Sequence, residues 1–368
     1  MNMLDYIDWR GDITFEEKGF NEVDSLVFCE LSYLDMDRVE AAHTGDGMTV
    51  AALYEAYAGL RPRPKPIMND ALIALRKAAI SARFRDVIVK RYVNDVNPDE
   101  HAQFSAVTFI YREDEAYVAF RGTDDTLVGW REDFNMSFLS ETYGQKAAVD
   151  YLNSVASETP DKLIVGGHSK GGNFAVYAAA FCDPDVRENR IVRVYSNDGP
   201  GFRKEVTDSE EYAAILPKIV KLVPESSLVG VLLGGKERCR YIKSEAKLFA
   251  QHDPYTWCVK GPRMEDAPDR SQVSVFMGDT IKNWLSGQDE EHRKTLVDVL
   301  FDSLETTGVD TVGDLNNAPM RIYTAFMKAL SNVDGESKSS IQQMMQKFIA
   351  TGMDVMTNGM KKDFTNNN

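Results

Sequence analysis

The chain has 368 residues, of which 43% are hydrophobic, and its formal net charge is −15 at pH 7. This size is ample for a large hydrophobic core, whereas the acidic balance argues against nucleic acid or an anionic membrane surface as a partner. The four cysteines form no C-x-x-C pair, so neither a zinc knuckle nor a redox dithiol is indicated, and we expect no metal or cofactor.

The N-terminal residues have neither the basic region nor the apolar region of a signal peptide. No stretch of the sequence approaches the roughly 20 apolar residues that a membrane-spanning helix requires. We therefore expect a cytoplasmic protein with no stable insertion into a membrane.

Residues 1–84 are predicted to form a helical segment that packs on the core of the protein. Residues 22–37 place apolar side chains on one stripe of a helix, which predicts an amphipathic helix there. Another helix is predicted over 68–84, with Asn69 or Asp70 as its N-cap.

Residues 85–265 are predicted to form an α/β core. Runs of β-branched and aromatic residues predict strands, and Ala-rich runs predict helices. In chain order the expected elements are strands over 86–96, 104–114 and 115–123, a helix over 142–158, a strand over 162–169, a helix over 173–182, and strands over 190–202, 215–224 and 240–246. Because strands and helices alternate in this region, we predict a mostly parallel sheet flanked by helices.

Beyond the core, residues 266–360 are predicted to form amphipathic helices that pack on the main domain. Residues 361–368 are predicted to be a disordered tail. The expected architecture is thus an α/β fold with additional helices at both ends of the chain.

The stretch "GGHSKGGN" (166–173) lies between a predicted strand and a predicted helix. It matches the G-x-S-x-G pattern of a nucleophile elbow, in which small neighbours allow a strained serine backbone on a tight turn. Such a turn exposes the hydroxyl of Ser169 and directs the next amide, that of Lys170, toward an oxyanion that develops on the substrate. We expect the second oxyanion amide from Thr123, which follows Gly122 after an earlier strand.

A nucleophilic serine needs a base, and the order serine, acid, histidine in α/β-hydrolases leaves two of the five histidines as candidates. His292 lies in a charged helix start and is expected to be a solvated surface residue. His252 lies in a loop after the last predicted strand, and we expect it to be the base. His168 adjoins the serine, but its side chain is expected to point away from the hydroxyl.

Two carboxylates are candidates for the acid that orients the histidine, namely Asp198 and Glu225, each at the C-terminal end of a predicted strand. Asp253 is the sequence neighbour of His252 and is not expected to reach the Nδ1 atom of that ring. Either candidate would hold the imidazole in the reactive tautomer, and the sequence leaves both open.

The stretches "FRGTDDTLVGWREDF" (120–134) and "GGHSKGGNFAVYAA" (166–179) together resemble the class 3 lipases of the α/β-hydrolase superfamily. The whole chain most closely resembles a bacterial domain family of unknown function, number 2974. The resemblance to class 3 lipases implies an α/β-hydrolase fold, with Thr123 as an oxyanion residue, Ser169 as nucleophile and His252 as base. One departure is that the family's acid is usually an aspartate, where this chain has Glu225.

These observations predict a serine hydrolase that acts on a small-molecule or lipid carboxylic ester. The alternative is a catalytically weak or inactive hydrolase fold that serves as a binding or scaffold protein. A further alternative is an acyltransferase or thioesterase that uses the same residues, because only the exclusion of water separates acyl transfer from hydrolysis.

Overall fold

The computed structural model describes residues 1–60, 66–97, 102–123, 141–227 and 229–272, together with isolated positions between 274 and 343. The chain divides into two compact units, Met1–Asp124 with Val128–Arg270, and Asp125–Leu127 with Ser271–Asn368. The description below concerns the first unit. The helices predicted over 266–360 lie almost entirely outside the described residues, and the tail predicted over 361–368 lies wholly outside them.

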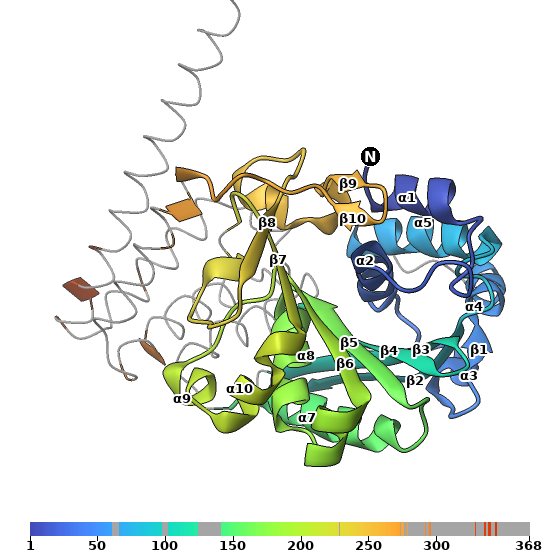
Figure 1. The fold of residues 1–368 in the computed structure, drawn as a ribbon, viewed down its shortest axis with the longest axis horizontal. Helices are drawn as coiled ribbons and strands as arrows, with labels where there is room; N and C mark the ends of the chain where they lie inside the picture. The colour runs from blue at the N-terminus through green and yellow to red at the C-terminus, as the bar shows by residue number, and fades with distance from the viewer. Residues whose placement is uncertain are drawn as a thin grey trace, which may run out of the picture. The chain divides into compact units, whose positions relative to one another are not determined.

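An eight-stranded sheet in the order β1-β2-β3-β4-β5-β6-β7-β8 forms the centre of this unit (Figure 1). Its strands are β1 (Met48–Thr49), β2 (Ile88–Asn97), β3 (Ala102–Arg112), β4 (Glu115–Phe120), β5 (Lys162–His168), β6 (Ile191–Asn197), β7 (Ile219–Pro224) and β8 (Cys239–Ile242). The first four strands pair antiparallel, and β4 to β8 pair parallel. A separate antiparallel pair consists of β9 (Val259–Lys260) and β10 (Arg263–Met264). The predicted α/β-hydrolase fold class, a mostly parallel sheet flanked by helices, is confirmed.

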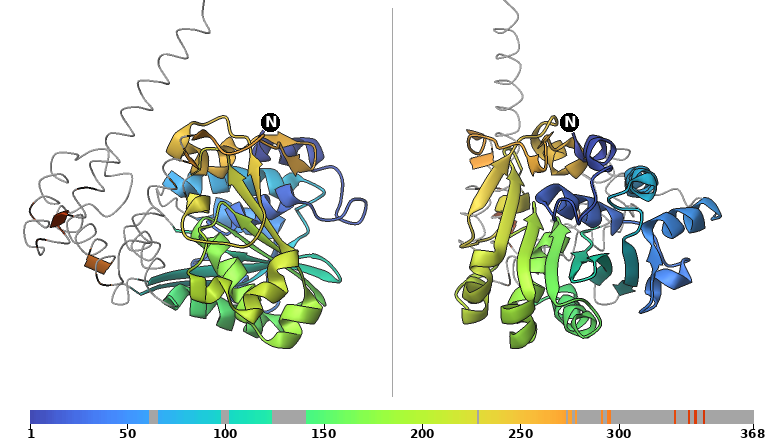
Figure 2. Two further views of the ribbon diagram at one scale, coloured as in Figure 1. Left: turned by 60° about the vertical axis from the view of Figure 1, so that its left-hand side comes forward. Right: turned by 45° about the vertical axis from the view of Figure 1, so that its right-hand side comes forward.

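Helices cover both faces of the sheet (Figure 2). They are α1 (Met3–Arg10), α2 (Glu22–Leu31), α3 (Glu40–His43), α4 (Val50–Ala58), α5 (Pro66–Ile80), α7 (Tyr143–Ala156), α8 (Lys170–Phe181), α9 (Lys204–Thr207) and α10 (Glu210–Ile215). Side chains alternate along β4, so that Tyr117 and Ala119 join a hydrophobic cluster with the N-terminal helices, while Val118 and Phe120 join a second cluster with α7 and α8. The sheet therefore separates two hydrophobic layers.

The register of the parallel strands places their C-terminal ends side by side. Phe120 of β4 pairs with Gly167 of β5, and His168 of β5 pairs with Asn197 of β6. The residues that follow these strands therefore meet at one edge of the sheet, which is where α/β folds bind ligands.

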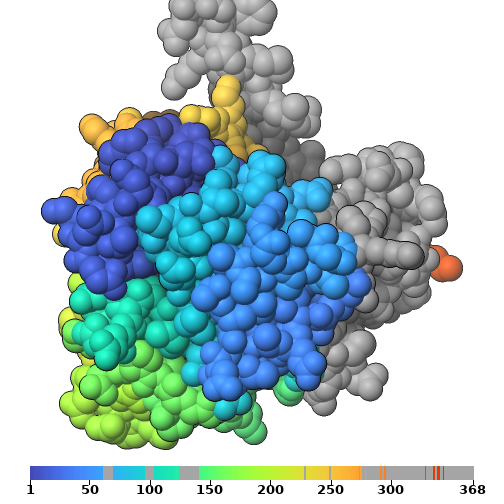
Figure 3. All heavy atoms as spheres, turned by 90° about the vertical axis from the view of Figure 1, so that its right-hand side faces the viewer, coloured from blue at the N-terminus to red at the C-terminus, as the bar shows by residue number. Residues whose placement is uncertain are grey.

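The N-terminal helices differ from the predictions in two respects. All ten residues of α2 are buried, because this helix packs on β4, β5 and β6 and is also covered by α1 and α5; the prediction of an amphipathic helix is wrong. Helix α5 begins at Pro66, where the fixed φ of proline suits the first helical position, so Asn69 and Asp70 lie inside the helix and the predicted N-cap is wrong. Figure 3 shows the N-terminal segment and α5 forming a continuous surface over their side of the unit.

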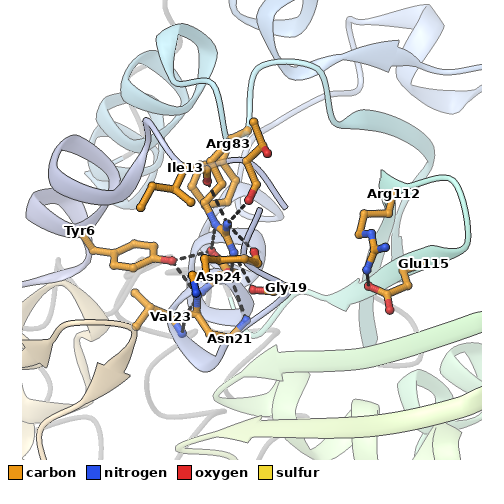
Figure 4. Close-up of polar contacts among 12 residues, drawn as sticks. Tyr6, Ile13, Gly19, Asn21, Val23, Asp24, Arg83, Arg112 and Glu115 are labelled. Atoms are coloured by element: carbon orange, nitrogen blue, oxygen red, sulfur yellow. Dashed lines mark hydrogen bonds and ion pairs between the residues drawn. The ribbon is translucent and has the colours of Figure 1, made fainter. Parts of the chain in front are cut away.

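A buried guanidinium fixes the loop that leads into α2 (Figure 4). Arg83 forms two hydrogen bonds to the carboxylate of Asp24, of 2.7 and 2.6 Å, and neither side chain is exposed to solvent. The same guanidinium also donates to four backbone carbonyl oxygens of the preceding loop, those of residues 13, 14, 18 and 19. Tyr6 of α1 donates a further hydrogen bond to Asp24, at 2.9 Å. These contacts hold α1, α2 and the end of α5 as one layer.

Candidate active site

Ser169 lies between the last residue of β5 and the first residue of α8. Its backbone has φ 57° and ψ −131°, a conformation that residues with a side chain rarely adopt. The turn is held by a hydrogen bond from the Ser169 N–H to the Asn197 carbonyl, of 3.0 Å, and by one from the Gly172 N–H to the Ser169 carbonyl, of 2.9 Å. The predicted strand, turn and helix are therefore all present, and the turn is strained at the serine.

Glycines on both sides of Ser169 are required by the close approach of neighbouring backbone. A Cβ atom at Gly167 would lie 2.1 Å from the carbonyl carbon of Gly171, and one at Gly171 would lie 2.1 Å from the carbonyl oxygen of Phe120. Real Cβ atoms essentially never make contacts so short, so a side chain at Gly167 would push the start of α8 away from β5, and one at Gly171 would push it away from the end of β4.

Three side chains at the carboxyl edge of the sheet form one chain of hydrogen bonds. The Nε2 atom of His252 is 2.9 Å from the Oγ atom of Ser169, and its Nδ1 atom is 2.6 Å from the Oδ2 atom of Asp198. His252 ends the short 3-10 helix Leu248–His252, and Asp198 directly follows β6. The Asp198 side chain is fully buried, and that of His252 is 21% exposed, so only the imidazole offers an edge to solvent.

Asp198 is held by donors other than the histidine. The Oγ atom of Ser227 donates to Oδ2 at 2.6 Å, and the N–H of Gly230 donates to Oδ1 at 3.1 Å. Asp198 itself has φ 53°, so its backbone is also in the left-handed region. Three hydrogen bonds, from Ser227, Gly230 and His252, thus hold the Asp198 carboxylate in place.

Glu225, the other candidate for the acid, lies outside this chain of hydrogen bonds. It is half-buried, its N–H bonds to the carbonyl of Ile242 at 3.0 Å, and its charge acts on Lys243. The structure therefore brings Asp198, and not Glu225, to His252. Ser227, two residues beyond Glu225, contacts the acid, and the sequence analysis did not anticipate this role.

The loop after β4 passes directly beside the serine. A Cβ atom at Gly122 would lie 2.5 Å from the carbonyl oxygen of His168 and 3.1 Å from the Cβ atom of Ser169. Thr123, the next residue, is buried, and residues 124–140 lie outside the described part of the chain. Lys170 begins α8 and is also buried, with its Nζ atom 5.6 Å from the ring centre of Phe174.

His168 contacts the main chain of the proposed base, a role that its expected direction away from the Ser169 hydroxyl did not indicate. Its Nε2 atom is 2.9 Å from the backbone carbonyl oxygen of His252, and its Nδ1 atom is 3.2 Å from the hydroxyl of Tyr33. Burial, followed by the nearby charge of His252, holds the pKa of His168 well below its usual value. The ring is therefore neutral, and the geometry requires that Nε2 donates to the carbonyl while Nδ1 accepts from Tyr33.

The comparisons with known proteins place the chain in a family. Residues 78–302, more than half of the chain, match the Mbeg1-like family. None of the curated proteins compared with the chain matches it.

Among solved structures, the M37 lipase is 15% identical with a TM-score of 0.36, and the likeness covers 57% of this chain and 69% of the lipase. A deletion mutant of Rhizomucor miehei lipase in its propeptide complex is 14% identical with a TM-score of 0.38, covering 69% and 75%. The native form of that complex is 15% identical with a TM-score of 0.33, covering 61% and 78%. The specific resemblance to domain family number 2974 and a bacterial origin stay predictions. The chain belongs to the Mbeg1-like family.

Proposed function

We propose that this protein is a serine hydrolase of carboxylic esters, in which Ser169 is the nucleophile, His252 the general base and Asp198 the acid that orients the base. The observation that supports this most strongly is the continuous hydrogen-bonded path from the serine hydroxyl through the imidazole to a buried carboxylate. Each atom of the path is at a distance that proton transfer and tautomer control require.

The proposed reaction has two halves. The Oγ atom of Ser169 bonds to the acyl carbon of the ester while its proton passes to Nε2 of His252. The tetrahedral intermediate then collapses, and the imidazolium gives the proton to the leaving alkoxide, which departs as the alcohol. Water attacks the acyl-enzyme with the same imidazole as base, which releases the carboxylic acid and restores the serine. Asp198 stays ionised throughout and stabilises the imidazolium.

The negative oxygen of the tetrahedral intermediate needs donors on the side away from His252. We assign this role to the backbone amides of Lys170 and Thr123. Lys170 is the first residue of α8, a helix of twelve residues whose N-terminal end provides positive potential. Thr123 follows the loop that passes beside the Cβ atom of Ser169.

Backbone strain favours an enzyme over a scaffold that merely retains the fold. Ser169 and Asp198 both have positive φ, and each such conformation costs about 1–3 kcal/mol. A site without chemistry has no need to hold a serine in such a conformation. An acyltransferase or thioesterase would use the same three side chains, and the product formed in water distinguishes them. In the part of the chain that the structure describes, no helix is long and apolar enough to cross a membrane.

The test is covalent labelling with a small fluorophosphonate, measured by intact mass. Wild type is expected to gain one phosphonyl adduct, and Ser169→Ala and His252→Ala are expected to lose the reaction. His43→Ala is the control, because this exposed histidine of α3 contacts the backbone carbonyl of Met36 and lies outside the hydrogen-bonded path to Ser169. A folded wild type that neither labels nor hydrolyses a short-chain ester would overturn the proposal, as would labelling that persists in Ser169→Ala.

A further inference from the structure

We propose that Tyr33 and His168 are positioning residues, which hold the backbone of the segment Leu248–His252 (the base loop) and so set the distance between the imidazole of His252 and the hydroxyl of Ser169. The inference rests on the proposed function, since it assigns to the same site two residues that position the proposed base. It also gives the N-terminal helical layer a role in activity, because Tyr33 comes just after α2.

The first contact in this arrangement is between His168 and the main chain of the base. The Nε2 atom of His168 is 2.9 Å from the carbonyl oxygen of His252, and the two rings lie 4.7 Å apart between centroids. His168 belongs to β5, so its position is fixed by the sheet. The base loop is thereby tied to the same strand that ends at the nucleophile.

The second contact, between Tyr33 and His168, determines which ring nitrogen of His168 carries the proton. Tyr33 is buried, and its hydroxyl lies 3.2 Å from Nδ1 of His168. A hydroxyl that donates to Nδ1 leaves the proton of the neutral ring on Nε2, where it is needed for the bond to the carbonyl of His252. The tyrosine therefore selects the tautomer that holds the base loop.

The surroundings of His168 keep its ring uncharged. An Oε1 atom of Glu30 lies 3.9 Å from Nδ1 of His168, and the carboxyl is buried. Burial and the nearby charge of Asp253 raise the pKa of Glu30 well above its usual value, so this group is neutral as well. A cationic ring so close to His252 would oppose the imidazolium that forms during the reaction, and a neutral one does not.

The same tyrosine also borders the loop expected to supply an oxyanion amide. A Cβ atom at Gly122 would lie 2.3 Å from the hydroxyl oxygen of Tyr33. One buried side chain therefore packs against the loop that precedes Thr123 and bonds to the residue that holds His252. Displacement of Tyr33 is expected to disturb both sides of the serine.

The experiment compares the limiting rate of phosphonylation with the affinity of the reversible complex that precedes it. His168→Met removes the donor and keeps a buried apolar side chain, whereas His168→Gln can place an amide N–H near the former Nε2 position. We expect the methionine variant to lose about 10–100-fold in the limiting rate with unchanged reversible affinity, because a shift of about 1 Å in a reacting group costs up to 10²-fold. We expect glutamine to restore most of that loss, and Tyr33→Phe to fall between the two.

Two matched controls separate positioning from general packing. Tyr151→Phe removes an equally buried hydroxyl that donates to the carbonyl of Arg91. His43→Gln replaces a ring nitrogen that lies 3.2 Å from the carbonyl of Met36. Both controls are expected to keep the wild-type rate.

The inference is overturned if His168→Met reacts at the wild-type rate, if glutamine fails to improve on methionine, or if the loss falls on the reversible affinity. Thermal melting identifies a variant that does not fold. If His168→Met does not fold, the test uses His168→Gln and Tyr33→Phe instead, and the inference is refuted if both variants react at the rate of the control variants. If the wild type itself does not react, the proposed function fails. If the wild type and every His168 variant react equally fast, the proposed function stands and only the positioning role fails.

Discussion

Asp198→Asn is expected to abolish most of the activity, because the donors around this side chain dictate how an amide must sit. The backbone N–H of Gly230 can only donate, so the amide oxygen must occupy the Oδ1 position. The amide nitrogen then occupies the Oδ2 position and faces Nδ1 of His252. The hydroxyl of Ser227 at that position can accept as well as donate a hydrogen bond.

The consequence is the wrong tautomer of the base. An amide that donates to Nδ1 leaves the imidazole proton on Nε2, where it cannot accept the proton of Ser169. The same exchange in a Ser-His-Asp protease lowers kcat about 10⁴-fold, which corresponds to about 5.5 kcal/mol in the barrier. The backbone does not complicate the comparison, because asparagine adopts the left-handed conformation of position 198 readily.

The assay measures hydrolysis of a short-chain ester and the rate of phosphonylation for the wild type, Asp198→Asn and Glu225→Gln. Glu225→Gln is expected to behave as wild type, because Glu225 lies outside the hydrogen-bonded path to His252. Circular dichroism and a melting curve verify that each variant is folded. The reasoning is refuted if Asp198→Asn keeps more than about a tenth of the wild-type rate, which is a loss below about 1.4 kcal/mol. Loss of activity in Glu225→Gln would assign the role of the acid to Glu225.

Two further predictions concern stability. Arg83→Met leaves the buried carboxylate of Asp24 without its ion-pair partner and is expected to cost about 3–5 kcal/mol of unfolding free energy in a urea titration. Lys77→Met breaks the exposed pair with Asp8 and is expected to cost at most about 1 kcal/mol. Equal losses in the two variants would contradict this prediction. Glu30 has a raised pKa in the folded state, so as pH rises above about 4.5 the unfolded chain ionises first and the wild type loses stability, by up to about 1.4 kcal/mol per pH unit. Glu30→Gln does not titrate, so its stability relative to wild type is expected to increase between pH 4 and pH 8, and a pH-independent difference in melting temperature would disprove the assignment.

Local sequence patterns were sufficient for the strands β2 to β8 and for the turn at Ser169, but not for the short strands β1, β9 and β10. The β-branched run before the glycines and the Ala-rich run after them each favour one type of element, and tertiary packing agrees with both. The strand predicted over 215–224 begins only at Ile219, because Ser209 caps a helix that continues through its first residues. A side-chain cap thus outweighed the apolar run.

The choice between the two acids could not be made from sequence, because it depends on strand order. Asp198 follows β6, the direct neighbour of the strand that leads to Ser169, and the pairing of His168 with Asn197 brings the two positions together. Glu225 follows β7, one strand further away. Nothing in either local sequence encodes that order.

The role of His168 was missed for a related reason. Its side chain was judged relative to its neighbour Ser169, whereas its partners, Tyr33 and the carbonyl of His252, come from segments that are remote in the sequence. The complete burial of α2 was equally hidden, because it depends on the helices that cover the far side of that helix.

The two left-handed turns at Ser169 and Asp198 bear on any attempt to make this protein more robust. Glycine relieves about 1–3 kcal/mol of backbone strain at such a position, but it also raises the entropy of the unfolded chain, and at Asp198 it would remove three hydrogen bonds of a buried carboxylate. A screen that rewards thermostability alone would therefore favour glycine at the proposed nucleophile, Ser169, and not at Asp198. Selection of more stable variants has to be coupled to phosphonate labelling, since glycine at Ser169 would relieve strain and abolish the proposed chemistry.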